Sequence, residues 1–134
     1  MTAGETGLMV TVIIVNYNAR DWMPRCFESL AAQTIFSRMQ VIFADNTSSD
    51  GSDQLAQELM AGWPNAVFLQ TGENLGFGRA CNRPVKQARG KYFPLLNPDV
   101  WLERDCLEQL VAAVGPLALN YDDDSFQSSG ARRT

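Results

Sequence analysis

The stretch Tyr92–Val100, YFPLLNPDV, decides the fold that this sequence predicts. Its first half is apolar enough for a buried strand, which Asn97, Pro98 and Asp99 cannot continue. A buried strand of an open α/β sheet delivers its last residues to the carboxyl edge, where such folds bind ligands. Pro98 restricts its own φ and disfavours helix at Asn97, so both polar side chains are held in place. We interpret Asp99 as a candidate metal ligand; the alternative is an ordinary Asn-Pro-Asp turn.

Composition excludes several classes of protein. The chain has 134 residues, 46% hydrophobic and 19% charged, which suits one globular domain. A formal net charge of -4 and a pI near 4.7 argue against a nucleic-acid partner, because phosphate binding needs clustered Lys and Arg. The sequence contains no histidine, which excludes Ser-His-Asp and Cys-His catalysis.

Cysteine usage and the N-terminus indicate the compartment. Three scattered cysteines have neither disulfide-framework nor zinc spacing and favour a reducing cytoplasm. Residues 1–8 are predicted to be a tail without the basic start of a signal peptide. The apolar run Leu8–Val15 is too short to span a bilayer, so any membrane contact is expected to be peripheral.

Strand-like and helix-like segments alternate along the chain. Apolar, β-branched runs predict four strands, at Met9–Val15, Met39–Ala44, Ala66–Gln70 and Tyr92–Leu96. Helical spacing predicts four helices, at Asp21–Gln33, from Asp50 to about Gly62, at about Arg79–Ala88, and at Asp105–Val114. Pro84 is expected to delay or kink the third helix, and Gly115 with Pro116 to stop the fourth. Residues 9–116 are therefore predicted to form an α/β domain, a doubly wound, mainly parallel sheet with helices on both faces.

All four predicted strands end in polar residues: Asn16–Asn18, Asp45 with Asn46, Glu73–Gly78, and Asn97–Asp99. In a parallel sheet these ends share one edge, which favours a single ligand crevice. Gly76 and Gly78 would let backbone amides approach a ligand, although turn glycines explain them equally well. The absence of G-x-G-x-x-G and of a Walker G-K-[ST] argues against NAD-type and P-loop proteins.

Four of these stretches, taken together, resemble one family. The motifs are VIIVNYN at Val12–Asn18, ADNTSSDGS at Ala44–Ser52, NLGFG at Asn74–Gly78 with Asn82, and LLNPDV at Leu95–Val100. In order and content they are similar to the nucleotide-binding half of the family 2 glycosyltransferases, in their rhamnosyltransferase-like branch. The resemblance implies a Rossmann-like GT-A fold that binds a nucleotide-sugar donor. Residues 117–134 then look like the start of a truncated acceptor-binding half, partly disordered; Leu117–Tyr121 could alternatively form one more strand.

The resemblance implies roles for individual residues. Tyr17 would pack on the base or ribose, and Asp45 would accept a hydrogen bond from a pyrimidine imide. Asp99 would hold Mn²⁺ or Mg²⁺ bridging the diphosphate, with Asn97 on the ribose or on a metal-bound water. The complete set of implied nucleotide-sugar contacts is Asn16, Tyr17, Asn18, Asp45, Asn46, Gly76, Phe77, Arg79 and Asn97.

For several residues an alternative that involves no ligand stays open. Tyr17 could merely cover the sheet edge, and Asn18 could cap the first helix. Arg79 could be a solvated cation at a helix start, and Asp50 is expected to be a cap. Trp22 and Trp101 are expected to be packing residues rather than platforms for sugars.

The activity that the resemblance implies is inverting transfer of a sugar from a UDP- or dTDP-sugar to a saccharide or lipid-linked acceptor, in cell-surface polysaccharide synthesis. The acidic base of that family is expected beyond the matched segment, so these residues alone are predicted to bind donor weakly and turn over little. Pro84 stands where the family usually has glycine. The alternatives are a non-catalytic nucleotide-sugar-binding or regulatory module and a scaffold for a protein partner. Self-association is also expected, through apolar surface that the acceptor half normally covers.

Overall fold

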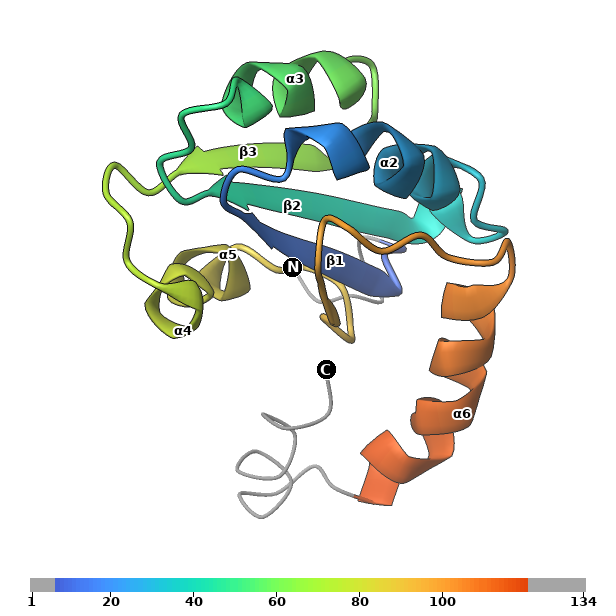
Figure 1. Ribbon diagram of the computed structural model, residues 1–134. Helices are drawn as coiled ribbons and strands as arrows, with labels where there is room; N and C mark the ends of the chain where they lie inside the picture. The colour runs from blue at the N-terminus through green and yellow to red at the C-terminus, as the bar shows by residue number, and fades with distance from the viewer. Residues whose placement is uncertain (1–6, 121–134) are drawn as a thin grey trace.

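The computed structural model describes residues 7–120, which form a parallel sheet with helices on both faces (Figure 1). The strands in this range are β1 (Val10–Asn16), β2 (Met39–Asp45), β3 (Ala66–Gln70) and β4 (Leu95–Leu96). Their order across the sheet is β3-β2-β1-β4, and every neighbouring pair is parallel. The predicted α/β fold is therefore confirmed.

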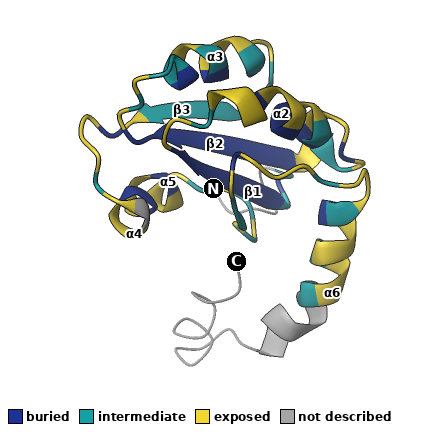
Figure 2. Cartoon of the chain, in the orientation of Figure 1, coloured by how far each residue is buried: buried dark blue, intermediate teal, exposed yellow. Residues whose placement is uncertain are grey.

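The last residues of three strands stand side by side. Asn16 pairs with Asp45 in the β1–β2 ladder, and Asp45 pairs with Gln70 in the β2–β3 ladder. β1 and β2 are buried along their whole length, as Figure 2 shows in dark blue, because helices cover both faces of the sheet. This register brings the polar strand ends to one edge, as the sequence predicts.

The last strand differs from the buried strand predicted at Tyr92–Leu96. It pairs continuously with β1 only at Leu95 and Leu96, and a single bridge joins Tyr92 to Val10. Pro94 interrupts the ladder because it has no N–H, although its carbonyl oxygen accepts a hydrogen bond from the Ile13 N–H. Leu95 and Leu96 are only half-buried, since β4 is an edge strand of the described sheet, so the prediction of a buried strand is wrong.

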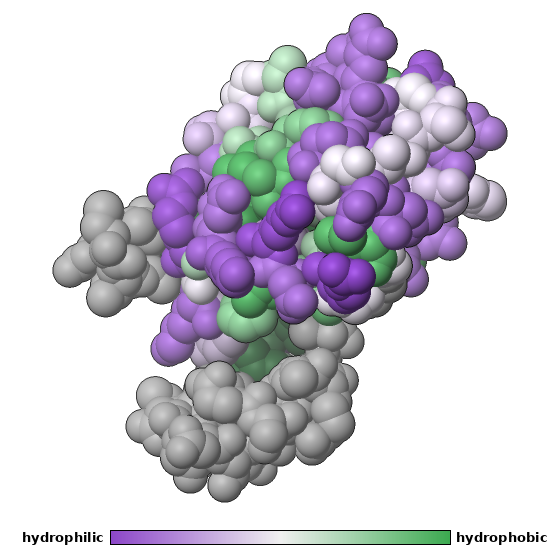
Figure 3. All heavy atoms as spheres, turned by 90° about the vertical axis from the view of Figure 1, so that its left-hand side faces the viewer, coloured by the Kyte–Doolittle hydropathy of each residue, from purple (hydrophilic) through white to green (hydrophobic). Residues whose placement is uncertain are grey.

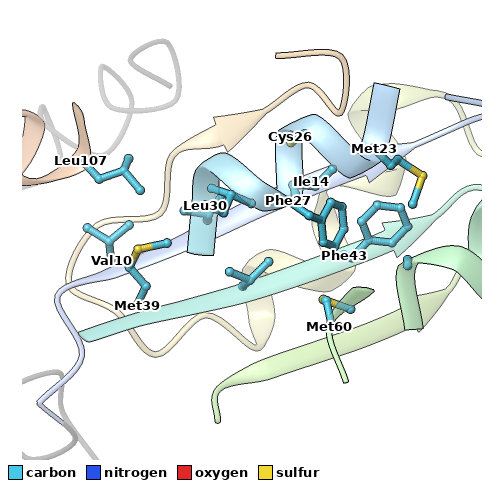
Figure 4. Close-up of a cluster of buried hydrophobic side chains, with 13 residues drawn as sticks. Val10, Ile14, Met23, Cys26, Phe27, Leu30, Met39, Phe43, Met60 and Leu107 are labelled. Carbon is cyan, nitrogen blue, oxygen red and sulfur yellow. The ribbon is translucent and has the colours of Figure 1, made fainter. Parts of the chain in front are cut away.

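One face of the sheet packs against α2 (Met23–Ala31) and α3 (Ser52–Leu59). The buried stripe of α2 points at this face, and Phe27 lies 5.6 Å, centroid to centroid, from Phe43 of β2 (Figure 4). A 3-10 turn at Arg20–Trp22 precedes α2, and Pro24 falls in the first turn, where no intrahelical N–H bond is lost. The buried residues of the stripe are Met23, Cys26, Phe27 and Leu30.

The other face packs against the short helices α4 (Phe77–Ala80) and α5 (Asn82–Lys86). Ala80 and Cys81 join Ile13 and Val15 in a second buried apolar cluster. The helix predicted at about Arg79–Ala88 is divided in two, with a break at Cys81. The delayed start expected because of Pro84 is therefore confirmed, since α5 begins at Asn82. The break places Pro84 in the first turn of α5, where its missing N–H is tolerated.

The last helix, α6 (Cys106–Asn120), runs past Gly115 and Pro116, which were expected to stop it. A proline destabilises the interior of a helix but does not always end it, and strong helix formers follow this one at positions 117–119. The alternative of a strand at Leu117–Tyr121 is therefore wrong up to Asn120, and the expected frayed tail lies outside the described residues. No helix among residues 7–120 is long and apolar enough to cross a membrane.

Candidate functional site

A pocket of about 270 Å³ opens between the loop that follows β1 and the loop that follows β4. It brings Tyr17 together with Asp99, although these residues are far apart in the sequence. The side of the molecule on which the strands end faces the viewer in Figure 3, where hydrophilic residues surround apolar areas. The pocket is lined by Val15, Tyr17, Asn18, Ala19, Trp22, Asn97, Pro98 and Asp99.

Both carboxylate oxygens of Asp45 are used inside the protein. Oδ1 accepts hydrogen bonds from Asn16 Nδ2 at 2.9 Å and from Ser48 Oγ at 2.6 Å. Oδ2 accepts from the Ser48 backbone N–H and from Gln70 Nε2, both at 2.9 Å. Burial acts to raise the pKa of Asp45, but these hydrogen bonds outweigh it and the pKa lies below its ordinary value. Asp45 is therefore a charged anchor for the ends of β1, β2 and β3.

This anchoring bears on the contact expected between Asp45 and a base. The side chain is fully buried, so a pyrimidine imide could reach it only if one of the four hydrogen bonds opened. Asn16 lies next to it and is also fully buried. Asn16 Oδ1 has no hydrogen-bond partner among the described residues. The one open buried acceptor at this position therefore belongs to Asn16 rather than to Asp45.

Asn18 ties the loop after β1 to the loop after β2. Its φ of 54° is left-handed, a conformation that Asn tolerates better than most residues. Its Oδ1 accepts from the Ser49 N–H at 2.8 Å, and its own N–H donates to Ser48 Oγ at 2.9 Å. The Arg20 N–H at the start of the helical turn donates to Asp50 Oδ2 at 3.0 Å and not to Asn18, so the alternative that Asn18 is a helix cap is wrong.

Asn46 organises the loop that joins β3 to α4. Its Oδ1 accepts from the Leu75 N–H at 2.9 Å and from Thr71 Oγ1 at 3.1 Å. Its Nδ2 donates to Asn74 Oδ1 at 2.9 Å, which in turn accepts from the Gly76 N–H at 3.1 Å. Asn46 is only 3% exposed, so the structure places it as a support of the loop. Gly76 needs glycine because its φ is 79°.

The turn after β4 presents Asn97 and Asp99 to the pocket. The Val100 N–H donates to the Asn97 carbonyl at 3.2 Å, and Pro98 is buried beneath the turn. The side chains of Asn97 and Asp99 are exposed and have no hydrogen-bond or ion-pair partner within residues 7–120. The turn alternative and the ligand alternative are thus compatible: the backbone forms the turn and leaves both side chains open.

These open side chains fit part of a divalent-cation site. In the described range, no three His, Cys, Asp or Glu side chains gather into a complete metal site. Asp99 and Asn97 nevertheless offer hard oxygen donors, which suit Mg²⁺ and Mn²⁺. Mg²⁺ in particular is commonly held by one or two carboxylates, with water and substrate phosphates completing its shell. The residues therefore fit a cation shared with a diphosphate.

The remaining expected contacts divide between two regions. Tyr17 is 52% exposed and forms part of the pocket wall, so its ring is open to a ligand. Phe77 begins α4, and Arg79 is exposed on that helix without a hydrogen-bond or ion-pair partner in the part of the chain described. Arg79 does not line the pocket. Both residues belong to α4, which directly follows the loop that Asn46 holds.

The structure also reveals a pocket residue that the sequence misassigns. Trp22 is 61% exposed and lines the pocket, so the expectation that it is a packing residue is wrong. Trp101 is 47% exposed but packs against Arg25 and does not line the pocket, in agreement with the expectation. Ser48 and Gln70 support the site through Asp45. Ser48 lies within the motif at Ala44–Ser52, but neither residue was expected to have a role in the site. The available signal for Trp22 was its position only four residues after the strand-end motif that closes at Asn18.

A parallel sheet with a polar pocket at its carboxyl edge defines an α/β domain of the open-sheet class, whose members bind their ligands at this edge. Residues 11–119 match the family described as Glycosyl transferase family 2. The chain belongs to this family.

Similar proteins include transferases of several kinds. The chain is 37% identical, over 79 residues, to an N-acetylglucosaminyl-diphospho-decaprenol L-rhamnosyltransferase of Mycobacterium tuberculosis, covering 59% of this chain and 24% of that protein. Two solved structures, each 23% identical, share the GT-A fold with a TM-score of 0.74. Residues 1–349 of Staphylococcus aureus TarS in complex with UDP-GlcNAc match 81% of this chain and 32% of that chain. The Pyrobaculum calidifontis mannosyltransferase PcManGT with GDP-Man and Mn²⁺ matches 78% and 32%.

The chain is short beside its relatives. It spans 30% of the length of the first curated relative that it matches and 14% of each of the next two.

Proposed function

We propose that this chain forms the donor-binding part of an inverting glycosyltransferase that uses a UDP- or dTDP-sugar. The observation that carries the proposal is the pocket in which Tyr17, Asn97 and Asp99 converge at the carboxyl edge of the sheet. Family membership supports the reaction class, and the TarS complex with UDP-GlcNAc supports the donor class.

In this proposal the exposed ring of Tyr17 packs on the base or ribose of the donor. Asn97 hydrogen-bonds the ribose or a water, and Asp99 holds Mn²⁺ or Mg²⁺ against the diphosphate. When bound, the cation would act as a Lewis acid that neutralises charge on the departing nucleoside diphosphate. Mn²⁺ in the PcManGT structure supports this assignment.

The buried residues position these contacts. Asp45 keeps the loops after β1 and β2 at a fixed distance through Asn16, Ser48 and Gln70. Asn46 holds the loop that ends at Gly76, from which backbone amides and Arg79 would approach the base or a phosphate. Such preorganisation saves the entropy of ordering loops when the donor binds.

The proposed chemistry is direct displacement at the anomeric carbon by an acceptor hydroxyl, which needs a general base. Among the described residues that line the pocket, Asp99 is the only carboxylate, and it is assigned to the cation. We therefore assign the base to a residue outside this pocket and expect the chain alone to bind donor but to transfer little.

The proposal also covers the acceptor, the cellular location and the self-association of the chain. The M. tuberculosis relative is a rhamnosyltransferase named for a lipid-linked substrate, which supports a saccharide or lipid-linked acceptor and a role in polysaccharide synthesis. A cytoplasmic location follows from the chemistry of the donor, with peripheral membrane association if the acceptor is lipid-linked. Exposed apolar residues such as Val85, Phe93 and Leu110 favour self-association of the chain.

Calorimetric titration of UDP and dTDP, with and without Mn²⁺, tests the donor site. We expect binding that Mn²⁺ strengthens, and Asp99→Asn should remove most of that gain. Asp105→Asn is the matched control, because Asp105 is exposed and lies outside the pocket. Absence of binding to either nucleotide would refute the proposal. If the intact gene product bound donor but never transferred sugar, the alternative of a non-catalytic module would be correct.

A further inference from the structure

Trp22 occupies an unusual position for a large aromatic side chain. It ends the 3-10 turn before α2, lines the pocket and is 61% exposed. Its ring has no aromatic or cation–π partner, and its indole N–H has no acceptor, among residues 7–120. Tryptophan is usually well buried, so an indole left open at a pocket is an available binding surface.

The turn with Asn97 and Asp99, which forms the other wall of the pocket, is held close to α2, the helix that Trp22 precedes. Arg25, one turn after Trp22, lies over the ring of Trp101 with 4.2 Å between its Cζ and the ring centroid. This cation–π contact ties the turn that carries Asn97 and Asp99 to α2. Trp22 and the polar side chains of that turn therefore face one pocket with a constrained width.

The chemistry of the pocket suits a sugar ring. A pyranose has an apolar face of C–H groups and a rim of hydroxyls. The indole of Trp22 offers a flat apolar surface, and Asn97 and Asp99 offer side-chain oxygens without partners in the described part of the chain. At about 270 Å³ the pocket lies just below the 300–1,000 Å³ of ordinary ligand sites, so it is large enough to enclose only part of a nucleotide sugar.

We propose that Trp22 is a stacking platform for a pyranose ring, brought either by the donor or by the acceptor. The inference rests on the proposed function and adds a specificity residue to it. It separates the two aromatic side chains of the pocket: Tyr17 serves the nucleoside and Trp22 serves the sugar. Affinity for a bare nucleoside diphosphate should then be independent of Trp22.

The test compares UDP with UDP-GlcNAc, both with Mn²⁺, on the wild type, Trp22→Leu and Trp22→Phe. One aromatic contact is worth about 0.5–1.5 kcal/mol, so Trp22→Leu should weaken UDP-GlcNAc binding about two- to tenfold and leave UDP unchanged. Trp22→Phe should retain most of the affinity. Phe93→Leu is the control, because Phe93 is an exposed aromatic residue that does not line the pocket.

Nuclear magnetic resonance supplies a second readout, which is measured on the wild-type protein. The Trp22→Leu variant is needed only to identify the Trp22 peak. The chain has three tryptophans, and the Trp22 indole N–H peak is the one that Trp22→Leu removes. A shift with UDP-GlcNAc but not with UDP indicates the donor sugar. A shift with the methyl glycoside of N-acetylglucosamine alone indicates the acceptor sugar.

The outcomes separate this inference from the proposed function. Equal weakening of UDP and UDP-GlcNAc in Trp22→Leu, or an indole shift with UDP alone, overturns the sugar platform while leaving the donor site intact. An indole peak that moves with none of the three probes, in a wild type that binds UDP, overturns it as well. A wild type that binds neither nucleotide overturns the proposed function first, and the platform with it.

Discussion

Replacing Asp45 with Asn should destabilise the protein strongly although the two side chains have the same shape. Four donor groups point at the carboxylate, from Asn16, Ser48 and Gln70. An amide keeps one acceptor oxygen and turns an NH₂ group toward the other donors, so at least one buried donor loses its acceptor. That loss costs about 1–3 kcal/mol, and losing the charge from the remaining bonds adds about 1 kcal/mol.

The total of about 2–4 kcal/mol corresponds to a fall in Tm of roughly 7–17 °C for a domain of this size. Thermal and urea unfolding followed by circular dichroism would measure it. Asp105→Asn is the control and should change stability by less than about 0.5 kcal/mol, because Asp105 is exposed and makes one side-chain hydrogen bond.

The pH dependence gives the refuting result. The folded-state pKa of Asp45 lies below its ordinary value, so its stabilisation is fully present above about pH 4 and is lost as the pH falls through the folded-state pKa. The stability difference between wild type and Asp45→Asn should therefore be constant from pH 7 to pH 5 and shrink in more acidic solution. A variant as stable as the wild type at pH 7, or a difference that grows below pH 4, would show that the hydrogen bonds do not act as described.

Two further predictions concern the Asn46 loop and the buried thiol. Asn46→Ala removes the acceptor of the Leu75 N–H and one of the three acceptors within reach of the Thr71 hydroxyl. Amide hydrogen exchange at Leu75 and in the loop around it should therefore accelerate at least about tenfold while exchange in β1 and β2 stays slow; unchanged exchange at Leu75 would contradict the anchoring role. Burial and the charge of Asp99 raise the pKa of the Cys26 thiol to about 12. Cys26 should therefore resist alkylation at pH 8 while the half-buried Cys106 reacts, which mass spectrometry of the labelled peptides would record. Equal labelling of both cysteines in the folded protein would contradict the burial of Cys26.

The sheet and its ligand edge were predictable from local pattern. Continuous β-branched runs can only be central strands, and β1 and β2 agree with their predicted positions to within a residue. The polar residues at the ends of such strands must meet at one edge, because parallel strands share direction. Tyr17, Asn97 and Asp99 accordingly line one pocket. The interruption of the third predicted helix was predictable as well. Pro84 has no N–H and is therefore tolerated in the first turn of a helix, where it lies in α5.

What only the tertiary structure decided is which polar side chains turn inward. Asp45 and Asn46 look like ligand contacts in the sequence, but their hydrogen-bond partners other than the local Ser48 come from other strands and loops, 25 to 29 positions away in the chain. No local pattern encodes those neighbours.

The same limit applies at the ends of elements. Trp22 lies near the apolar stripe of α2 in sequence, but it sits in a 3-10 turn, where the helical period does not hold, and its ring points to the pocket instead of the core. Likewise, the edge position of β4 depends on which strands lie beside it. Periodicity therefore determined the elements of this protein, and long-range packing determined which of their polar and aromatic side chains remain open to a ligand.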